Sequence, residues 1–389
     1  MDISHIINHL GEDRSNYYQA VSPPIFQSSN FTFESIDKMR HSLTDEMNTP
    51  FYTRGCNPTV SILRKKIAAL AQAEDSLIFS SGSAAICAAV ISQVKAGEHI
   101  ICVAKPYGWT NKLLTVLLSR FGVTHTFVDG TNAENFEKAI QNNTKLIFLE
   151  SPNSITFELQ DVAAVVKIAK KHNLVTIMDN SYATPLYQSA IAMGIDITVH
   201  SASKYLNGHS DIVAGALCSS EKICRHIFEG EFMTLGGIIS PNDAFLMLRG
   251  LRTLPIRLER VTHNTLIVTD FLAQHEKVEK LNYPFHKDFP QYELAKKQMK
   301  GAGGLFSMQI KAENIVQVEA FCNHLKRFLL ACSWGGHESL IFPICVLHTS
   351  ENYSNVDLPW NLVRFYIGLE DPKALIDDLQ KALDFAFKI

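Results

Sequence analysis

The chain lacks a strong net charge and a long apolar run. Its 36 Lys and Arg nearly balance 39 Asp and Glu, for a formal net charge of −3, which gives no electrostatic case for binding nucleic acid or an anionic membrane. The longest apolar run, residues 84–94, is too short to span a bilayer and predicts a buried helix. The first residues hold no basic segment followed by an apolar one, so we expect no signal peptide. We therefore expect a cytoplasmic protein with no nucleic-acid or membrane partner.

Paired cysteine motifs are also missing. No two of the eight cysteines have C-x-x-C spacing, and most lie in apolar segments, where a free thiol behaves as a small hydrophobic side chain. Their positions are Cys56, Cys87, Cys102, Cys218, Cys224, Cys322, Cys332 and Cys345. We predict reduced thiols, and neither a disulfide framework nor a metal site.

What the chain does have is the composition of a globular protein with a large core, 46% hydrophobic and 19% charged residues. From about residue 76 to 218, short apolar runs alternate with amphipathic stretches such as 83–97 and 161–173. This alternation predicts an α/β domain with a mostly parallel sheet of seven strands and helices on both faces. The expected strands are 76–80, 99–103, 124–128, 145–150, 174–179, 197–201 and 213–218.

The two ends of the chain have a different pattern. Residues 1–58 lack the alternation, and consecutive prolines in "VSPPIFQSSNFTF" indicate an extended arm. The pattern changes again after "RGLRTLP", residues 249–255. We predict three parts: an arm over 1–58, a large α/β domain over 59–250 and a smaller C-terminal α/β domain over 251–389. The last part is expected to hold a long helix at 256–275, a loop at 283–292, strands at 304–310 and 361–369, and helices near 314–328 and 372–387.

Residues that can carry chemistry follow the expected strands, where parallel α/β sheets bind ligands. Gly82 and Ser83 open a helix after the first strand, Tyr107 follows the second, and Asp179 ends a strand of Val, Ile and Met. Lys204 lies in "HSASKYLNGHSD", between two apolar segments. Each residue alone has an ordinary alternative: a helix cap for Ser83, a core cover for Tyr107, a turn cap for Asp179 and an exposed loop lysine for Lys204.

Together these residues supply a phosphate site, an aromatic ring to stack on a cofactor, an acid and an amine. Pyridoxal 5′-phosphate (PLP) needs this set, because its aldehyde bonds to a lysine and its ring nitrogen needs an acidic partner. A nicotinamide cofactor would require G-x-G-x-x-G after the first strand, and "SGSAAI" does not supply it. A Walker P-loop is absent as well.

Several longer motifs resemble one enzyme family in both order and spacing. They are "FYTRGCNPT" (51–59), "SSGSAAI" (80–86), "ESPNSITFELQDV" (150–162), "MDNSYATP" (178–185), "SASKYLNGHSDIVAGAL" (201–217), "RGLRTL" (249–254) and "LVRFYIGLED" (362–371). The resemblance is to the Cys/Met-metabolism PLP-dependent enzymes of trans-sulfuration and covers nearly the whole chain. It implies a fold type I aminotransferase-like architecture and a PLP cofactor.

The resemblance also implies roles in cofactor binding. Lys204 would hold the cofactor covalently and move protons, Asp179 would pair with the pyridinium nitrogen, and Tyr107 would stack on the ring and take part in proton transfer. The phosphate would be bound by Gly82, Ser83, Ser201 and Ser203.

For the substrate and the assembly, the resemblance implies further residues. Arg364 would bind the α-carboxylate of an amino-acid substrate, where a bidentate guanidinium fits well. Ser333, Tyr52 and Asn153 would complete the substrate site. Tyr52 and Arg54 would also reach the phosphate of a neighbouring subunit, which implies an obligate dimer and, in the usual form of the family, a dimer of dimers.

Two stretches favour the cystathionine β-lyase branch of this family. "ACSWGGHESLI" (331–341) has Trp after the serine, and Cys332 stands where many γ-acting members have Glu. "ESPNSITFE" is similar to the β-lyase pattern "ESPGSIT". One departure is that bacterial β-lyases have Tyr at the position of Cys332. We therefore expect β-elimination of L-cystathionine or related cysteine S-conjugates to a thiol, pyruvate and ammonia.

Two alternatives stay open. The first is a γ-acting relative: cystathionine γ-lyase, cystathionine γ-synthase, methionine γ-lyase or an O-acylhomoserine sulfhydrylase. The second is a silent relative that serves as a binding scaffold, although such a protein would be expected to lack the lysine or the aspartate, and both are present.

Overall fold

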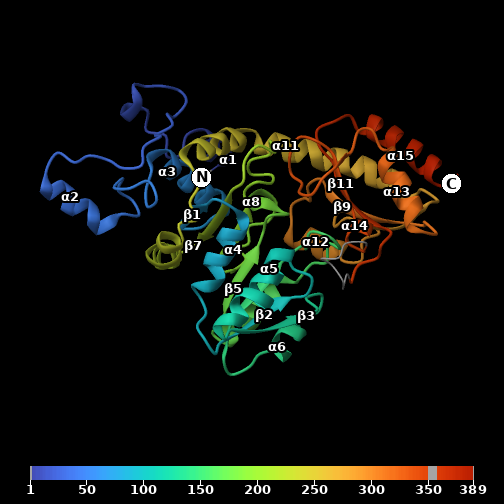
Figure 1. Cartoon of the computed structure of the whole chain (residues 1–389), viewed down its shortest axis with the longest axis horizontal. Coiled ribbons are helices and arrows are strands. Elements are labelled where there is room, and N and C mark those ends of the chain that lie inside the picture. The colour runs from blue at the N-terminus through green and yellow to red at the C-terminus, as the bar shows by residue number, and fades with distance from the viewer. Residues whose placement is uncertain (1, 349–356, 389) are drawn as a thin grey trace. The chain divides into compact units, whose positions relative to one another are not determined.

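The computed structural model describes residues 2–348 and 357–388 and divides into two compact units (Figure 1). The first comprises Met1–Ser151, Gln160–Asn207 and Asp211–Thr253. The second comprises Pro152–Leu159, Gly208–Ser210 and Leu254–Ile389. Two short segments from the middle of the chain, 152–159 and 208–210, thus belong to the C-terminal unit.

The first unit is built on a seven-stranded sheet with the order β1-β7-β6-β5-β4-β2-β3. Strand β7 runs antiparallel to β1 and β6, and the other neighbouring pairs are parallel. The prediction of a mostly parallel seven-stranded sheet is confirmed, and no predicted strand end is off by more than two residues. The strands are β1 Asp75–Phe79, β2 His99–Val103, β3 Thr124–Val128, β4 Thr144–Glu150, β5 Val175–Asp179, β6 Ile197–Ser201 and β7 Gly215–Ser219.

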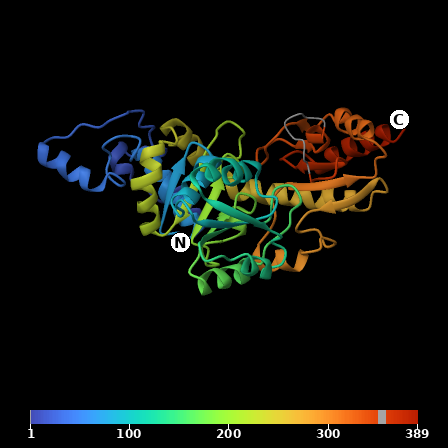
Figure 2. The same ribbon diagram turned by 60° about the horizontal axis from the view of Figure 1, so that its bottom comes forward.

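Alternation along the strands sends side chains into two separate cores. In β2, Ile100 packs into the core that contains helix α4 (Gly82–Ile91), whereas Ile101 packs into the core that contains α7 (Val162–Lys171). Because both faces are apolar, the sheet is covered by helices on both sides, as Figures 1 and 2 show. The remaining helices of this unit are α1 Ile3–Asn8, α2 Ile36–Ser42, α3 Pro58–Ala71, α5 Gly108–Lys112, α6 Glu134–Lys138, α8 Thr184–Tyr187, α9 Glu221–Ile227 and α10 Met233–Leu235.

The N-terminal segment is less extended than the prolines suggest. Helices α1 and α2 were not predicted, although residues 23–28 between them have no regular structure. The buried Lys66 of α3 fixes the first part of the chain: its Nζ lies 3.1 Å from Oε1 of Glu12 and donates to the carbonyls of Ile6 and Ile7. Helix α2 projects away from the sheet, and its apolar Ile36 is exposed (Figure 1).

Helix α11 (Pro241–Ala273) differs from the helix predicted at 256–275, although the boundary between the two units falls at Thr253 and Leu254. It begins far before residue 256 and holds Pro255 in its interior. The physical reason is that its buried leucines continue at helical spacing through the proline, at Leu248, Leu251, Leu254 and Leu258. Packing of this apolar stripe outweighs the hydrogen bond that the proline removes.

The second unit contains a five-stranded sheet with the order β10-β11-β12-β9-β8. Only two of these strands were predicted, together with helices that correspond to α13 and α15. Its elements are β8 Val278–Asn282, α12 Tyr292–Gln298, β9 Leu305–Ile310, α13 Ile315–His324, β10 Leu329–Leu330, β11 Leu340–Pro343, α14 Cys345–His348, β12 Leu362–Tyr366 and α15 Pro372–Ala386. All eight cysteines are free thiols. Within residues 2–348 and 357–388, no helix combines the length and the apolar content that crossing a bilayer requires.

Candidate active site

The predicted phosphate site is at the start of α4, against the end of β6. Ser81 is the N-cap, with its hydroxyl accepting from Ala84 N–H at 3.0 Å, so Ser83 is not the cap. The N–H groups of Gly82 and Ser83 have no partner among the residues that the structure describes. A Cβ on Gly82 would lie 2.9 Å from Cβ of Ser201, so only glycine allows this approach. Free N–H groups at a helix start beside a serine hydroxyl form an anion site.

Ser203 has a different position from Ser201. Its hydroxyl donates to the carbonyl of Ala214 at 3.2 Å and accepts from the N–H of Ala214 at 2.9 Å. These bonds tie the segment that contains Lys204 to the chain leading into β7. The Lys204 N–H donates to the carbonyl of Ser201 at 3.1 Å, which closes a tight turn directly after β6. The turn places the lysine at the carboxyl edge of the parallel sheet, as predicted.

Asp179 ends the neighbouring strand β5 and is buried. Burial raises the pKa of its carboxyl, and the Ser181 N–H, which donates to Oδ1 at 2.9 Å, and the charge of Lys204 act in the opposite direction. A buried carboxylate is stabilised further by a cationic partner. The protonated nitrogen of a pyridine ring supplies one.

Two residues that sequence reasoning missed organise this edge of the sheet. Glu150 ends β4 opposite Asp179, and its Oε2 accepts from the N–H of Tyr107 at 2.6 Å. The hydroxyl of Ser181 accepts from the N–H of Ser201 at 2.6 Å. The sequence contained a signal for Glu150: it follows the apolar run "KLIFL", just as Asp179 follows an apolar strand. Glu150 thus fixes the backbone of Tyr107, whose side chain is 40% exposed.

Tyr52 and Arg54 lie together in the N-terminal segment of the same unit. Both side chains are exposed, and the guanidinium carbon of Arg54 lies 5.6 Å from the centroid of the Tyr52 ring. No hydrogen bond or ion pair joins either side chain to the Lys204 segment within the described residues. The phenol of Tyr52 and the guanidinium of Arg54 are therefore exposed rather than hydrogen-bonded to the Lys204 segment of their own chain.

In the second unit, Arg364 lies on β12 without a carboxylate partner among the described residues. Its guanidinium donates to the carbonyls of Ser154 and Ser333, each at 3.4 Å, and lies 5.4 Å from the centroid of Phe342. Burial lowers the pKa of Arg364 to about 10, so the side chain stays cationic at neutral pH. A half-buried cation whose partners among the described residues are carbonyls and an aromatic ring fits a ligand carboxylate.

Asn153 uses its amide within its own loop. The Oδ1 atom accepts from the N–H groups of Ile155, Thr156 and Phe157 at 2.9–3.1 Å, and Nδ2 donates to the Glu158 carboxylate. The side chain is buried. Asn153 therefore shapes the loop whose carbonyl at Ser154 contacts Arg364.

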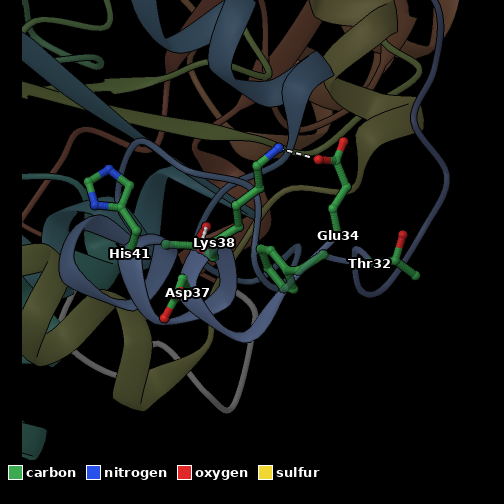
Figure 3. A pocket seen from close by; sticks show the side chains of 7 residues that line it. Thr32, Glu34, Asp37, Lys38 and His41 are labelled. Carbon is green, nitrogen blue, oxygen red and sulfur yellow. Dashed lines mark hydrogen bonds and ion pairs between the residues drawn. The ribbon is translucent and has the colours of Figure 1, made fainter.

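A hollow of about 490 Å³ in the N-terminal segment is unrelated to these residues. In Figure 3 the side chains of Lys38 and Glu34 point toward each other and form an ion pair. Arg40 likewise pairs with Asp37 at 2.6 Å. Because the charges are already paired and solvent-exposed, we assign no ligand to the hollow. Its lining residues are Thr32, Phe33, Glu34, Asp37, Lys38, His41 and Ser42.

The residues at the sheet edge fit PLP. The open helix start with Gly82 and Ser201 fits its phosphate, Asp179 fits its ring nitrogen and the amine of Lys204 fits its aldehyde. Fold and site together define a PLP-dependent enzyme of the α/β class.

Comparison with known proteins agrees with this class and makes it specific. The family described as "Cys/Met metabolism PLP-dependent enzyme" matches residues 5–384. The L-methionine gamma-lyase of Treponema denticola is 39% identical over 383 residues, which cover 97% of this chain and 95% of that protein. The cystathionine gamma-lyase of Bacillus subtilis is 36% identical over 369 residues, 94% of each chain. The chain belongs to the Cys/Met metabolism family, and its cofactor is pyridoxal phosphate.

A solved structure confirms the fold. The crystal structure of metB from Corynebacterium glutamicum matches with a TM-score of 0.91 at 33% identity and covers 99% of this chain and 98% of that chain. The comparisons do not favour the expected β-lyase chemistry. The two relatives above are named gamma-lyases, so the comparisons favour the γ-acting alternative over the cystathionine β-lyase interpretation.

Proposed function

We propose that the protein is a carbon–sulfur lyase that performs γ-elimination on L-methionine or L-cystathionine. The observation that carries the proposal is the pair of γ-lyases, each similar to this chain over at least 94% of its length. The products are 2-oxobutyrate and ammonia, with methanethiol from L-methionine or L-cysteine from L-cystathionine.

In this proposal Lys204 is the base and acid of the reaction. Its amine takes the proton from Cα of the substrate and moves protons at Cβ, and the bound cofactor supplies the electron withdrawal that makes those protons acidic. Asp179 keeps the ring nitrogen protonated. This role is supported by the burial of its carboxyl and by the charge of Lys204 acting on it.

The substrate's α-carboxylate binds to Arg364. The proposal is supported by the carbonyl contacts that orient the guanidinium and by the lack of a carboxylate partner among the described residues. Ser333 contributes through its carbonyl. Asn153 acts indirectly, by shaping the loop that contains Ser154.

Tyr107 stacks on the cofactor ring from a backbone that Glu150 fixes. Tyr52 and Arg54 bind the phosphate of a second copy of the chain, so each active site is shared and the protein is at least a dimer. The exposed, mutually stacked side chains of Tyr52 and Arg54 support this assignment.

β-Elimination of L-cystathionine is the second candidate, because of one position. Cys332, which stands where many γ-acting members have Glu, is exposed. A thiol in place of a carboxylate changes how the distal end of a substrate is held.

Product identification separates the two candidates. The purified holoenzyme is incubated with L-cystathionine and, separately, with L-methionine, and the keto acid is identified by chromatography of its hydrazone. We expect 2-oxobutyrate from either substrate. Pyruvate from L-cystathionine, with no product from L-methionine, would establish the β-lyase instead.

A further inference from the structure

Two loops of the second unit meet at the side chain of Glu338. The hydroxyl of Ser210 donates to Oε1 of Glu338 at 2.6 Å, and Oε2 lies 3.1 Å from Nδ1 of His337. Ser210 belongs to the segment 208–210, which follows Lys204 in the chain, and Glu338 ends the loop 331–338, which contains Ser333. The carboxylate thus joins the segment after the lysine to the loop of the proposed substrate site.

Both loops have backbone conformations that need support. Ser210 has φ +57° and Ser333 has φ +77°, in the left-handed region that side chains with a Cβ rarely adopt. Such residues persist where the surrounding structure holds them, and they cluster at functional sites. The contact between the loops is close: a Cβ on Gly336 would lie 2.1 Å from Oγ of Ser210 and 2.4 Å from Oε2 of Glu338. The guanidinium of Arg257 lies close to the backbone of the same segment, since a Cβ on Gly208 would lie 1.8 Å from Nη1.

The backbone around Glu338 is anchored. Its neighbour Ser339 donates through N–H and hydroxyl to the Glu370 carboxylate, at 2.8 and 2.9 Å. The Leu369 N–H donates to the carbonyl of His337 at 2.9 Å. Strand β11 then pairs with β12, where Phe342 lies opposite Arg364. The carboxylate of Glu338 is therefore a fixed point from which the Ser210 segment is held.

The loop that Glu338 ends also orients the proposed carboxylate-binding arginine. The carbonyl of Ser333 accepts from Nη2 of Arg364 at 3.4 Å. This contact is long, so it depends on the loop keeping its conformation. A change in the 331–338 loop would turn the guanidinium away from the orientation that two parallel hydrogen bonds to a carboxylate require.

We propose that Glu338 is a positioning residue for amino-acid binding. Through its bond to Ser210 it holds the 208–210 segment and the 331–338 loop together, and through Ser333 it keeps Arg364 oriented for the substrate α-carboxylate. It takes no part in proton transfer and does not bind the cofactor. The inference rests on Arg364 binding the substrate carboxylate, and it is independent of whether elimination is β or γ.

The test compares the holoenzyme forms of the wild type, Glu338→Ala, Ser210→Ala, the double variant and Glu338→Gln. Glu319→Ala, which removes an exposed glutamate of the same unit, is the control. Glycine serves as the binding probe, because it has the amine and carboxylate of a substrate but no leaving group, and its Kd is read from the change in cofactor absorbance. KM and kcat are measured with L-methionine and L-cystathionine, and the cofactor content and Tm of each variant are recorded.

We expect Glu338→Ala and Ser210→Ala each to raise the glycine Kd and the KM about tenfold, as for loss of a hydrogen bond to a charged group. We expect the kcat and cofactor content of these variants, and all values of the Glu319→Ala control, to stay within about threefold of wild type. The glycine Kd and KM of the double variant should be no higher than those of either single variant, because both substitutions remove the same interaction. Glu338→Gln keeps an acceptor for Ser210 and should stay within about threefold of wild type.

Additive effects in the double variant, unchanged glycine binding, or loss of cofactor in parallel with kcat would overturn the inference. If Glu338→Ala does not fold, Ser210→Ala decides the question by the same criteria. If the wild type turns over neither substrate, the proposed function fails, whereas the glycine titration still tests the role of Glu338.

Discussion

Replacing Arg364 with glutamine should make the protein more stable and much less active. Burial lowers the pKa of Arg364 to about 10, which corresponds to about 3 kcal/mol against the charged form of the side chain. The unfolded chain binds this proton more tightly, so this whole cost in folding free energy is present at neutral pH and is relieved only as the pH rises above about 10. The two 3.4 Å hydrogen bonds and the contact with Phe342 offset about 1–2 kcal/mol of it. The net gain in the free energy of unfolding for Arg364→Gln is about 1 kcal/mol, or a Tm about 1 °C higher for a chain of 389 residues.

The loss of activity follows from the same side chain. Two charge-assisted hydrogen bonds to the substrate carboxylate are each worth about 1.5–3 kcal/mol, so we expect kcat/KM to fall at least about 100-fold. Differential scanning calorimetry and steady-state kinetics measure the two effects on the holoenzyme, with the exposed Arg327→Gln as the control that changes neither. A variant that is less stable than wild type and keeps kcat/KM within tenfold would refute the reasoning.

Three further predictions concern the cofactor. Gly82→Ala places a Cβ 2.9 Å from Cβ of Ser201 and should weaken PLP binding about tenfold in equilibrium dialysis. Gly230→Ala, whose added Cβ would have no atom within 4 Å, should leave the PLP affinity unchanged. Equal PLP affinities of the two variants would refute the phosphate site. Because burial raises the pKa of Asp179 above 3.8, ionising it costs folding free energy at neutral pH. Asp179→Asn should therefore leave the cofactor-free protein at least as stable as wild type by thermal unfolding, while kcat/KM of the holoenzyme falls at least about 100-fold; a destabilised apoprotein would contradict this. Arg54→Ala and Lys204→Ala, inactive alone, should regain about a quarter of wild-type activity after unfolding and refolding together, because a mixed dimer holds one intact site; no recovery would argue against shared sites.

The central sheet could be predicted from the sequence because its strands are buried on both faces. Largely apolar runs such as "HIICV" and "KLIFLE" indicate buried strands rather than exposed segments. The ends of these strands fall where polar residues begin. The direction of β7 could not be predicted, because an apolar run is the same for parallel and antiparallel pairing. In the second unit, β10 consists of two exposed leucines and β8 has two charged residues among its five, so neither has the apolar pattern of a buried strand.

Some residues of the candidate site could likewise be predicted from the sequence, and others could not. Asp179, Gly82 and Lys204 follow strands that could be located, so their shared edge could be predicted. Glu338 could not, because its role depends on a bond to Ser210, 128 positions away, and no local pattern predicts such a contact. Arg364 was found only through family resemblance, since an arginine in a strand is ordinary until its guanidinium is seen to lack a carboxylate partner among the described residues.

The bond between the cofactor and Lys204 tests the central claim most directly. The holoenzyme is reduced with borohydride, digested and mapped by mass spectrometry, which locates the lysine that holds the cofactor. We predict the pyridoxyl group on Lys204, in the peptide that contains "HSASKYLNGHSD". A pyridoxyl group on any other lysine, or a reduced holoenzyme with Lys204 unmodified, would contradict the account.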